Sequence, residues 1–181
     1  MLCSKQNTRI FTVVKSKAII SNVFRIALVI KSYIKSFPIT ENQKAKNFQT
    51  YGIRTAIGIG NMRIVNTEQG IWDGEAIYMS GRSLEGMNAL NKGTLSVCTS
   101  KRQLSCSLQT IALLTDAIMN DMTLRQSEVI YYKLLGLKET DIARNLGISQ
   151  SGVNKASSAT KWYCIEEALK FFEQINFNEY E

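Results

Sequence analysis

The chain has 181 residues, a formal net charge of +7, four cysteines and no histidine. The absence of histidine excludes a Ser-His-Asp triad and the usual Cys-His nucleophile pair. None of the cysteines belongs to a CxxC pair, so we expect reduced, mostly buried thiols and no metal site. The length provides for one or two small domains.

The positive charge is unevenly distributed along the chain. Residues 1–50 contain nine Lys or Arg and a single acidic residue, which gives +8. Residues 123–162 contain six bases and three acids, which gives +3. Because most of the excess lies near the N-terminus, the net charge alone is a poor argument for nucleic-acid binding, and local patterns are a better one.

The most apolar segment, residues 19–37, predicts an amphipathic helix and not a membrane span. Arg25, Lys31 and Lys35 interrupt it, and Pro38 follows. The N-terminus has no signal-peptide pattern, so we expect a cytoplasmic protein.

The first sixty residues predict two strands and one helix. A short strand is expected at residues 9–14 and a helix at 21–36, and the helix ends before Pro38. The apolar stripe of this helix contains Val23, Phe24, Ala27, Ile30 and Ile34. The clearest strand is 53–60, where large and small side chains alternate between the two faces. The small face, with Gly58 and Gly60, predicts that another element packs closely against it.

The next segments complete a mixed pattern of helices and strands. The expected elements are a hairpin starting at 62–65 with a turn at 68–70, a helix at 73–90, a strand at 94–99, a polar linker at 100–107 and a helix at 108–119. The second helix should contact its neighbours through Ile77, Ser80, Gly81, Leu84 and Met87. The third should bury Leu108, Ile111, Leu114 and Ile118.

The order of the elements predicts an α+β fold. Strand, helix, strand, strand, helix, strand is the order of a small ferredoxin-like sandwich. We expect three parts: an α+β domain at residues 1–100, a linker with a connecting helix at 101–122, and an all-α domain at 123–181.

The third part contains the most specific pattern in the chain, a helix-turn-helix. Thr123 and Gln126 match a capping box, which predicts a helix over 124–135. In residues 139–156, Ala143 supplies a small residue where two helices cross and Gly147 a turn with positive φ. Ser149 is expected to cap the second helix. The shared core should contain Ile142, Leu146, Ile148 and Val153.

The second helix of this motif carries the candidate DNA-binding residues. They are Gln150, Ser151, Asn154, Lys155, Ser158 and Lys161. Asn and Gln can pair with adenine through two hydrogen bonds, and Lys can bind guanine or phosphate. We expect a transcriptional regulator that binds double-stranded DNA. The alternative is a ligand- or nucleotide-binding module whose helical tail contacts protein.

The last helix, expected at 160–175, has an apolar stripe of Ile165, Leu169 and Phe172. The stripe could close the helix-turn-helix core or meet a second copy of the chain in a homodimer. Both uses are open at the level of sequence.

Residues 24–38 (FRIALVIKSYIKSFP), 53–60 (IRTAIGIG) and 72–87 (WDGEAIYMSGRSLEGM) resemble the SatD-like family of bacterial proteins. The segment 123–155 resembles the tail domains of sigma factors and LuxR-type regulators. The resemblance to the SatD-like family covers nearly the whole chain from about residue 23 onward. It implies a degenerate, nucleotide-cyclase-like α+β domain, which in some members of the family is followed by a DNA-binding tail.

The start of the chain departs from this family. Relatives open with an additional strand and helix and carry two Gly-Asp pairs, one of them in the strand before the helix at 24–38. The matching region here, with Phe11 and Thr12, has no acidic residue. We therefore expect a truncated member with an incomplete sheet and an uncovered edge strand.

The residues available for catalysis argue against an enzyme. Cyclase-type chemistry needs two carboxylates on adjacent strands to hold Mg²⁺. This chain offers Asp73 and Glu75 at an expected helix start, where acids stabilise the helix dipole in any case. Gly58 and Gly60 lack the third glycine and the basic residue of a phosphate loop. No cofactor is expected.

Overall fold

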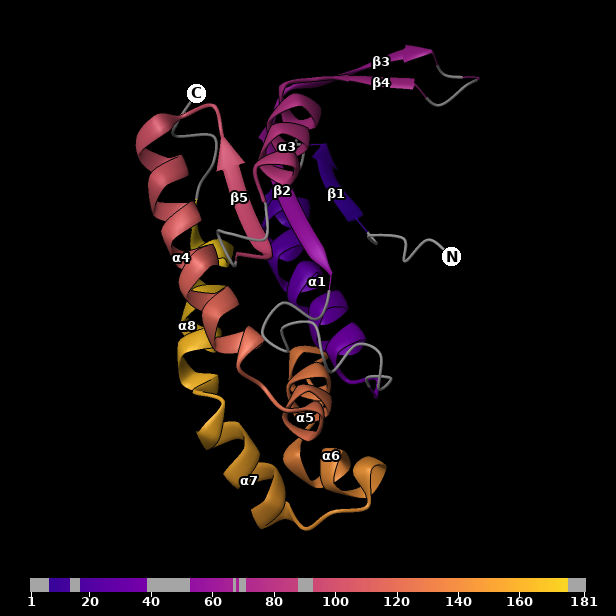
Figure 1. Cartoon of the computed structure of the whole chain (residues 1–181), viewed down its shortest axis with the longest axis vertical. Helices are drawn as coiled ribbons and strands as arrows, with labels where there is room; N and C mark the ends of the chain where they lie inside the picture. Colours follow the sequence, from indigo (N-terminus) through magenta and orange to yellow (C-terminus); the bar gives the residue numbers. More distant parts are fainter. Residues whose placement is uncertain are drawn as a thin grey trace.

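The computed structural model describes residues 7–13, 17–38, 53–66, 68, 71–87 and 93–175 (Figure 1). Its elements are, in chain order, β1 (Asn7–Val13), α1 (Lys17–Lys35), β2 (Arg54–Gly60), β3 (Met62–Asn66), β4 (Ile71–Gly74), α3 (Glu75–Gly86), β5 (Leu95–Thr99), α4 (Arg102–Asn120), α5 (Leu124–Leu134), α6 (Glu139–Leu146), α7 (Gln150–Ala159) and α8 (Trp162–Gln174). Within these ranges, no helix combines the length and apolar character that crossing a membrane requires.

Three of the strands form a parallel sheet in the order β1-β2-β5. β3 and β4 pair antiparallel with each other, and this hairpin projects from one end of the molecule (Figure 1). The predicted mixture of helices and strands is confirmed. The described strands do not pair as in a ferredoxin-like sandwich, because β3 forms a separate ribbon with β4 instead of joining the main sheet.

The small face of β2 packs directly against α3. A Cβ atom built on Gly58 would lie 2.1 Å from the carbonyl oxygen of Ala76 and 3.1 Å from the backbone nitrogen of Ser80. The predicted close approach is therefore confirmed, with Ser80 as a contact residue. The expectation for Gly81 is wrong, because a Cβ there would have no atom within 4 Å.

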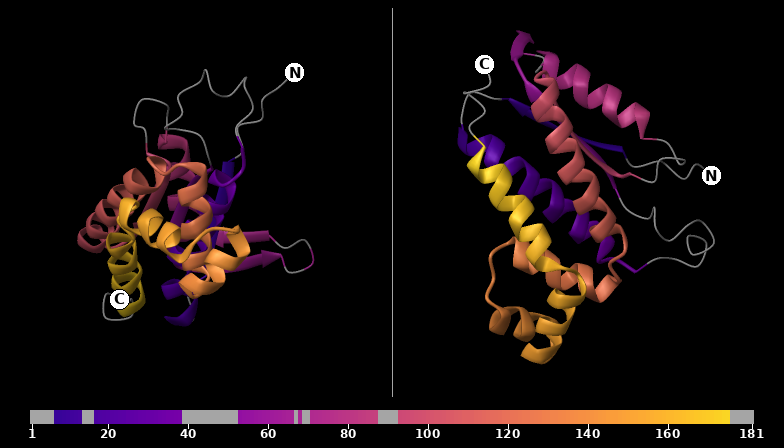
Figure 2. Two further views of the ribbon diagram at one scale, coloured as in Figure 1. Left: turned by 90° about the horizontal axis from the view of Figure 1, so that it is seen from below. Right: turned by 90° about the vertical axis from the view of Figure 1, so that its left-hand side faces the viewer.

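The opposite face of β2 contributes to one apolar core that reaches the C-terminal helix. Ile57 and Ile59 belong to the same buried cluster as Phe24 of α1 and Phe172 of α8. α1 contacts the sheet and also packs against α5 and α8. The views in Figure 2 show α8 running beside α1 and α4. The segments expected as separate α+β and helix-turn-helix domains thus share a continuous core through α1.

Several predicted boundaries and core positions are corrected by the structure. The expected linker at 100–107 is largely helical, because α4 begins at Arg102 and packs along β5. α3 spans 75–86, so Asp73 belongs to strand β4 and not to a helix start. Leu114, expected in the core, is 62% exposed. The predicted turn at 68–70 lies mostly outside the described residues.

Candidate nucleic-acid interface

Helix α5 precedes the two helices of the helix-turn-helix and packs against them, and local hydrogen bonds define both of its ends. The amide of Gln126 donates to Thr123 Oγ1 (3.3 Å) and the amide of Thr123 donates to Gln126 Oε1 (2.9 Å), which confirms the capping box. After α5, Gly136 has φ +82°, and the amides of Gly136 and Leu137 donate to the carbonyls of Lys133 and Tyr132. This is a Schellman motif, which satisfies the last carbonyls of the helix.

The turn between α6 and α7 also contains a glycine with positive φ and the two hydrogen bonds of a Schellman motif. Gly147 has φ +62°, and the amides of Gly147 and Ile148 donate to Arg144 and Ala143. Ser149 then caps α7, since its Oγ accepts a hydrogen bond from the Gly152 amide at 3.1 Å. Both sequence predictions for this turn, positive φ at Gly147 and an N-cap at Ser149, are confirmed.

The three helices enclose a small core of their own. Val129 of α5, Ile142 of α6 and Val153 of α7 are fully buried against one another. Ala143 lies partly buried at this contact, as the crossing of α6 and α7 requires. The partly buried neighbours also include Tyr132, Leu137, Leu146, Ile148 and Ala156. The expected core is confirmed, although Leu146 and Ile148 line its margin.

The candidate DNA-binding residues all lie on the surface. Five of them come from α7 and follow it at positions i, i+1, i+4, i+5 and i+8, which places them on one face of the helix. We call this surface, together with Lys161 between α7 and α8, the α7 face; its members are Gln150, Ser151, Asn154, Lys155, Ser158 and Lys161, and all are exposed. Val153 and Ser157 point the opposite way, into the protein.

The charges around the α7 face are only partly neutralised. Each acid between residues 123 and 162 is paired with a base of the same segment. The pairs are Arg125–Glu128 (2.9 Å), Lys133–Glu139 (2.9 Å) and Arg144–Asp141 (3.1 Å). Within the described residues, Lys138, Lys155 and Lys161 have no carboxylate within ion-pair distance, and all three are exposed. The formal +3 of this segment is therefore carried by three lysines.

Lys161 also has an unusual backbone. With φ 53° and ψ 44° it is the one non-glycine residue with positive φ among the described residues. An L-residue pays about 1–2 kcal/mol for this left-handed conformation. The residue before it, Thr160, is buried and donates its hydroxyl to the carbonyls of Ala156 and Ser157. The turn it forms directs α8 back toward α1.

The helix-turn-helix is joined to the rest of the protein by α8 and α1. Arg25 of α1 donates to the Leu134 carbonyl at the end of α5 and pairs with Glu173 of α8 at 2.6 Å. Lys133 bridges α5 to Glu139 of α6, and its ammonium lies 5.3 Å from the centroid of the Trp162 ring.

The apolar stripe of α8 has a different role from either one expected. Ile165, Leu169 and Phe172 are buried in the main core. They neither close the separate core around Val153 nor remain available for a second copy of the chain.

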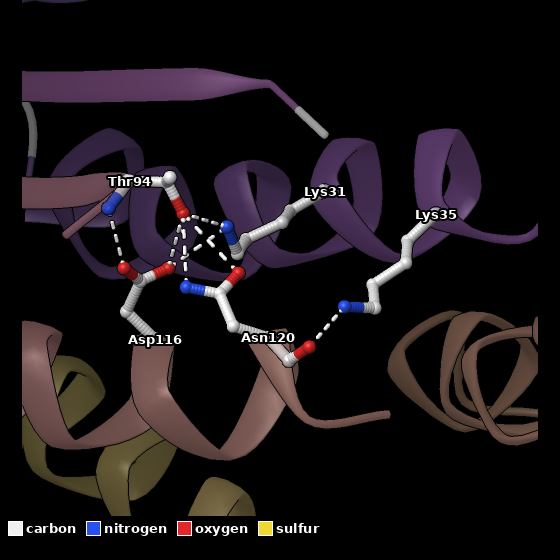
Figure 3. Close-up of polar contacts among 5 residues, drawn as sticks. All are labelled: Lys31, Lys35, Thr94, Asp116 and Asn120. Carbon is white, nitrogen blue, oxygen red and sulfur yellow. Dashed lines mark hydrogen bonds and ion pairs between the residues drawn. The ribbon is translucent and has the colours of Figure 1, made fainter. Parts of the chain in front are cut away.

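A second group of polar residues, which the sequence did not predict, is buried between α1 and α4 (Figure 3). We call it the Lys31 cluster; its members are Lys31, Lys35, Thr94, Asp116 and Asn120. Lys31 Nζ lies 2.8 Å from Asp116 Oδ1, and both side chains are 2% exposed. Asp116 also accepts hydrogen bonds from the Thr94 amide (2.5 Å) and hydroxyl (2.8 Å). Lys35 donates to the carbonyl of Asn120.

Burial controls the ionisation of the two lysines. Loss of hydration lowers the pKa of Lys31, while the charge of Asp116 and its hydrogen bond oppose the change. The pKa of Lys35 is lowered to about 8 by loss of hydration and by repulsion from the charge of Lys31. The negative charges of Asp121 and Asp116 act in the opposite direction and raise this pKa. The polar atoms shown in Figure 3 form hydrogen bonds and ion pairs with one another. We therefore interpret the cluster as a structural contact that joins α1, α4 and the residue before β5. In the sequence, Lys31 is recognisable only as a charged residue that interrupts the apolar segment 19–37.

Of the two acidic residues considered for catalysis, Asp73 lies at the end of the β3–β4 hairpin and Glu75 is the first residue of α3. Asp73 pairs with Arg63 of the neighbouring strand at 2.9 Å, and this hydrogen bond is the main cause that lowers the pKa of Asp73. The described ranges contain no group of three or more Cys, Asp or Glu side chains that could hold a metal ion. Comparisons of the chain with protein-family models, with curated proteins and with solved structures gave no match.

Proposed function

We propose that this protein is a transcriptional regulator that binds double-stranded DNA through the α7 face. The observation that carries the proposal is the contrast between the two sides of α7. One side packs on α5 and α6, and the other presents amide, hydroxyl and ammonium groups to solvent. The major groove of DNA admits an α-helix, and these groups hydrogen bond to base edges and phosphates.

The distribution of charge supports DNA over the alternative of a protein partner. Lys138 precedes α6, while Lys155 and Lys161 lie on the α7 face. In a helix-turn-helix the first helix crosses the DNA backbone and the second enters the groove, so these positions suit phosphate contacts. A protein-binding surface would favour exposed apolar side chains, and α7 exposes no large apolar side chain. The strained backbone at Lys161 is a further sign of a functional position.

The sheet and the helices that pack on it are proposed to support DNA binding without contacting DNA. Because residues 53–60 and 72–87 resemble SatD-like proteins, we assign the sheet with α1, α3 and α4 to a cyclase-like module for sensing or dimerisation. The protein is proposed to be non-enzymatic. Incubation with ATP or GTP and Mg²⁺ should give no cyclic or dinucleotide product. Product that disappears in an Asp73→Asn variant would contradict this.

DNA binding is expected to involve a homodimer, because three lysines on one copy make few phosphate contacts. Half-sites would then lie about one helical turn apart. The α8 stripe is buried, so the candidate surface that remains is the edge of the sheet, where β1 is an end strand. Light scattering should give about twice the chain mass of 20.4 kDa. A monomer that protects a single short half-site would exclude pairing.

The direct test is a gel-shift series with the full chain and genomic fragments at several salt concentrations. Lys155→Ala and Lys161→Ala should each weaken binding and reduce the slope of log K against log salt by about 0.9. Lys101→Ala is the matched control, because this exposed lysine precedes α4 at the end of the molecule away from α7 (Figure 1). The proposal fails if the chain retards no fragment. It also fails if Gln150→Ala combined with Asn154→Ala changes neither affinity nor sequence preference.

A further inference from the structure

Two carboxamides dominate the N-terminal half of the α7 face. Gln150 and Asn154 are one helical turn apart and exposed. Among the residues that the structure describes, neither side-chain amide has a hydrogen-bond partner. Each therefore offers an adjacent donor and acceptor to a ligand. The recognition helix of a helix-turn-helix contacts base edges mainly through its N-terminal residues, and these two positions lie there.

The α7 face lacks the groups that usually recognise G·C pairs. Arginine is the commonest residue for bidentate pairing with guanine, and carboxylates accept from cytosine N4. The chain has no arginine after Arg144, and α7 has no acidic residue. The two arginines of the motif, Arg125 and Arg144, are paired with Glu128 and Asp141 on α5 and α6. The one remaining candidate for guanine is Lys155, whose single ammonium cannot reproduce the planar two-donor geometry of arginine.

From this inventory we propose that the α7 face recognises A·T base pairs in the major groove, with Gln150 and Asn154 each bonded to N6 and N7 of an adenine. The inference rests on the proposed function. Four residues of helix rise about 6 Å, and base pairs of B-DNA are about 3.4 Å apart. The two adenines are therefore one or two base steps apart, on either strand. Lys155 and Lys161 supply phosphate contacts that are independent of sequence.

The test removes the acceptor atom on the DNA instead of altering only the protein. The full chain is first used to enrich duplexes from a random-sequence library. The best duplex is then resynthesised with 7-deazaadenine at its adenines, or with 7-deazaguanine at its guanines, because each analogue loses N7 and keeps Watson–Crick pairing. Binding should weaken at least about fivefold with 7-deazaadenine, since a bidentate contact contributes about 1–3 kcal/mol of discrimination. Binding to the 7-deazaguanine duplex should equal binding to the parent duplex.

The protein variants assign the effect to individual side chains. In a chain with both Gln150→Ala and Asn154→Ala, replacing adenine by 7-deazaadenine should cause no further loss. Lys155→Ala should weaken the parent and both modified duplexes by the same factor. Thermal melts confirm that each variant folds, as expected for exposed positions.

The outcomes separate this inference from the proposed function. Binding that is lost with 7-deazaguanine, or that is insensitive to both analogues, overturns adenine recognition and leaves DNA binding intact. A loss with 7-deazaadenine that persists in the double variant overturns the assignment to Gln150 and Asn154. Failure to enrich or retard any duplex overturns both proposals.

Discussion

Phe24 of α1 and Phe172 of α8 stack face to face, with ring centroids 3.9 Å apart and ring planes within 4° of parallel. Both side chains are completely buried. The contact joins a helix beside the sheet to the helix that follows the helix-turn-helix. Since the two parts share this core, the described fold should unfold as one cooperative unit.

Phe172→Ala should destabilise the whole protein by about 3–5 kcal/mol, because it opens a cavity at this junction. Phe171→Ala is the matched control, since its side chain is 38% exposed and should cost much less. Urea unfolding followed by circular dichroism measures both. Two separate transitions in the wild type would show that the helix-turn-helix folds independently of α1.

Lys31→Met should be strongly destabilising, because it leaves the carboxylate of Asp116 buried without its cation. Removal of one member of a buried pair costs about 3–5 kcal/mol, whereas replacing both members by apolar residues is often near neutral. The double variant Lys31→Met with Asp116→Leu should therefore recover part of the loss, reduced by the Thr94 hydrogen bonds that Asp116 accepts. Equal unfolding midpoints for wild type and the single variant would contradict a charged pair.

The stability of the wild type should rise with pH between about 8 and 10.5 as Lys35 loses its proton. The folded pKa of Lys35 is lowered to about 8 from 10.5, so the unfolded chain binds more protons in this window. The free energy of unfolding then increases with pH until both states are deprotonated. Lys35→Met keeps the length of the side chain and removes this contribution. The stability of wild type relative to Lys35→Met should increase across the window, and a constant difference would argue against the lowered pKa.

Gly58→Ala should destabilise the packing of β2 against α3 by about 1–3 kcal/mol, because the new methyl group meets the backbone carbonyl of Ala76. Gly81→Ala, in the middle of α3, provides the opposite case. Its methyl group would have open space, and the change should stabilise the helix by about 0.5–1 kcal/mol. Thermal melts that show the same sign for both variants would refute this packing.

Gly147 and Lys161, the left-handed residues before and after α7, should respond to substitution in opposite directions. Gly147→Val places a β-branched residue at φ +62° and should destabilise the turn. Lys161→Gly relieves a strained residue and should stabilise the fold by up to about 1 kcal/mol, while it weakens DNA binding through loss of the ammonium group. Lys161→Ala separates the effects, since it loses the charge and keeps the strain. If Lys161→Gly lowers the melting temperature, the backbone at this position is not strained.

The sequence was sufficient to predict those features that depend on hydrogen bonds between residues a few positions apart. The caps at Thr123 and Ser149 and the positive φ at Gly147 each depend on hydrogen bonds that span three to five residues. Amphipathic spacing was equally informative about Val153 and Ile142, because a helix with one apolar face must bury it. For the same reason the polar α7 face could be predicted from residue types alone.

Only the tertiary structure decided which distant segments meet. The periodicity of α8 predicted a buried stripe but not its partner, and the structure places it against α1. The burial of Lys31 follows from Asp116, a residue 85 positions away on another helix, and no local rule predicts that pairing. The separate β3–β4 ribbon likewise depends on strand partners, which are selected by packing over the whole chain and not by the alternation of residues within one strand.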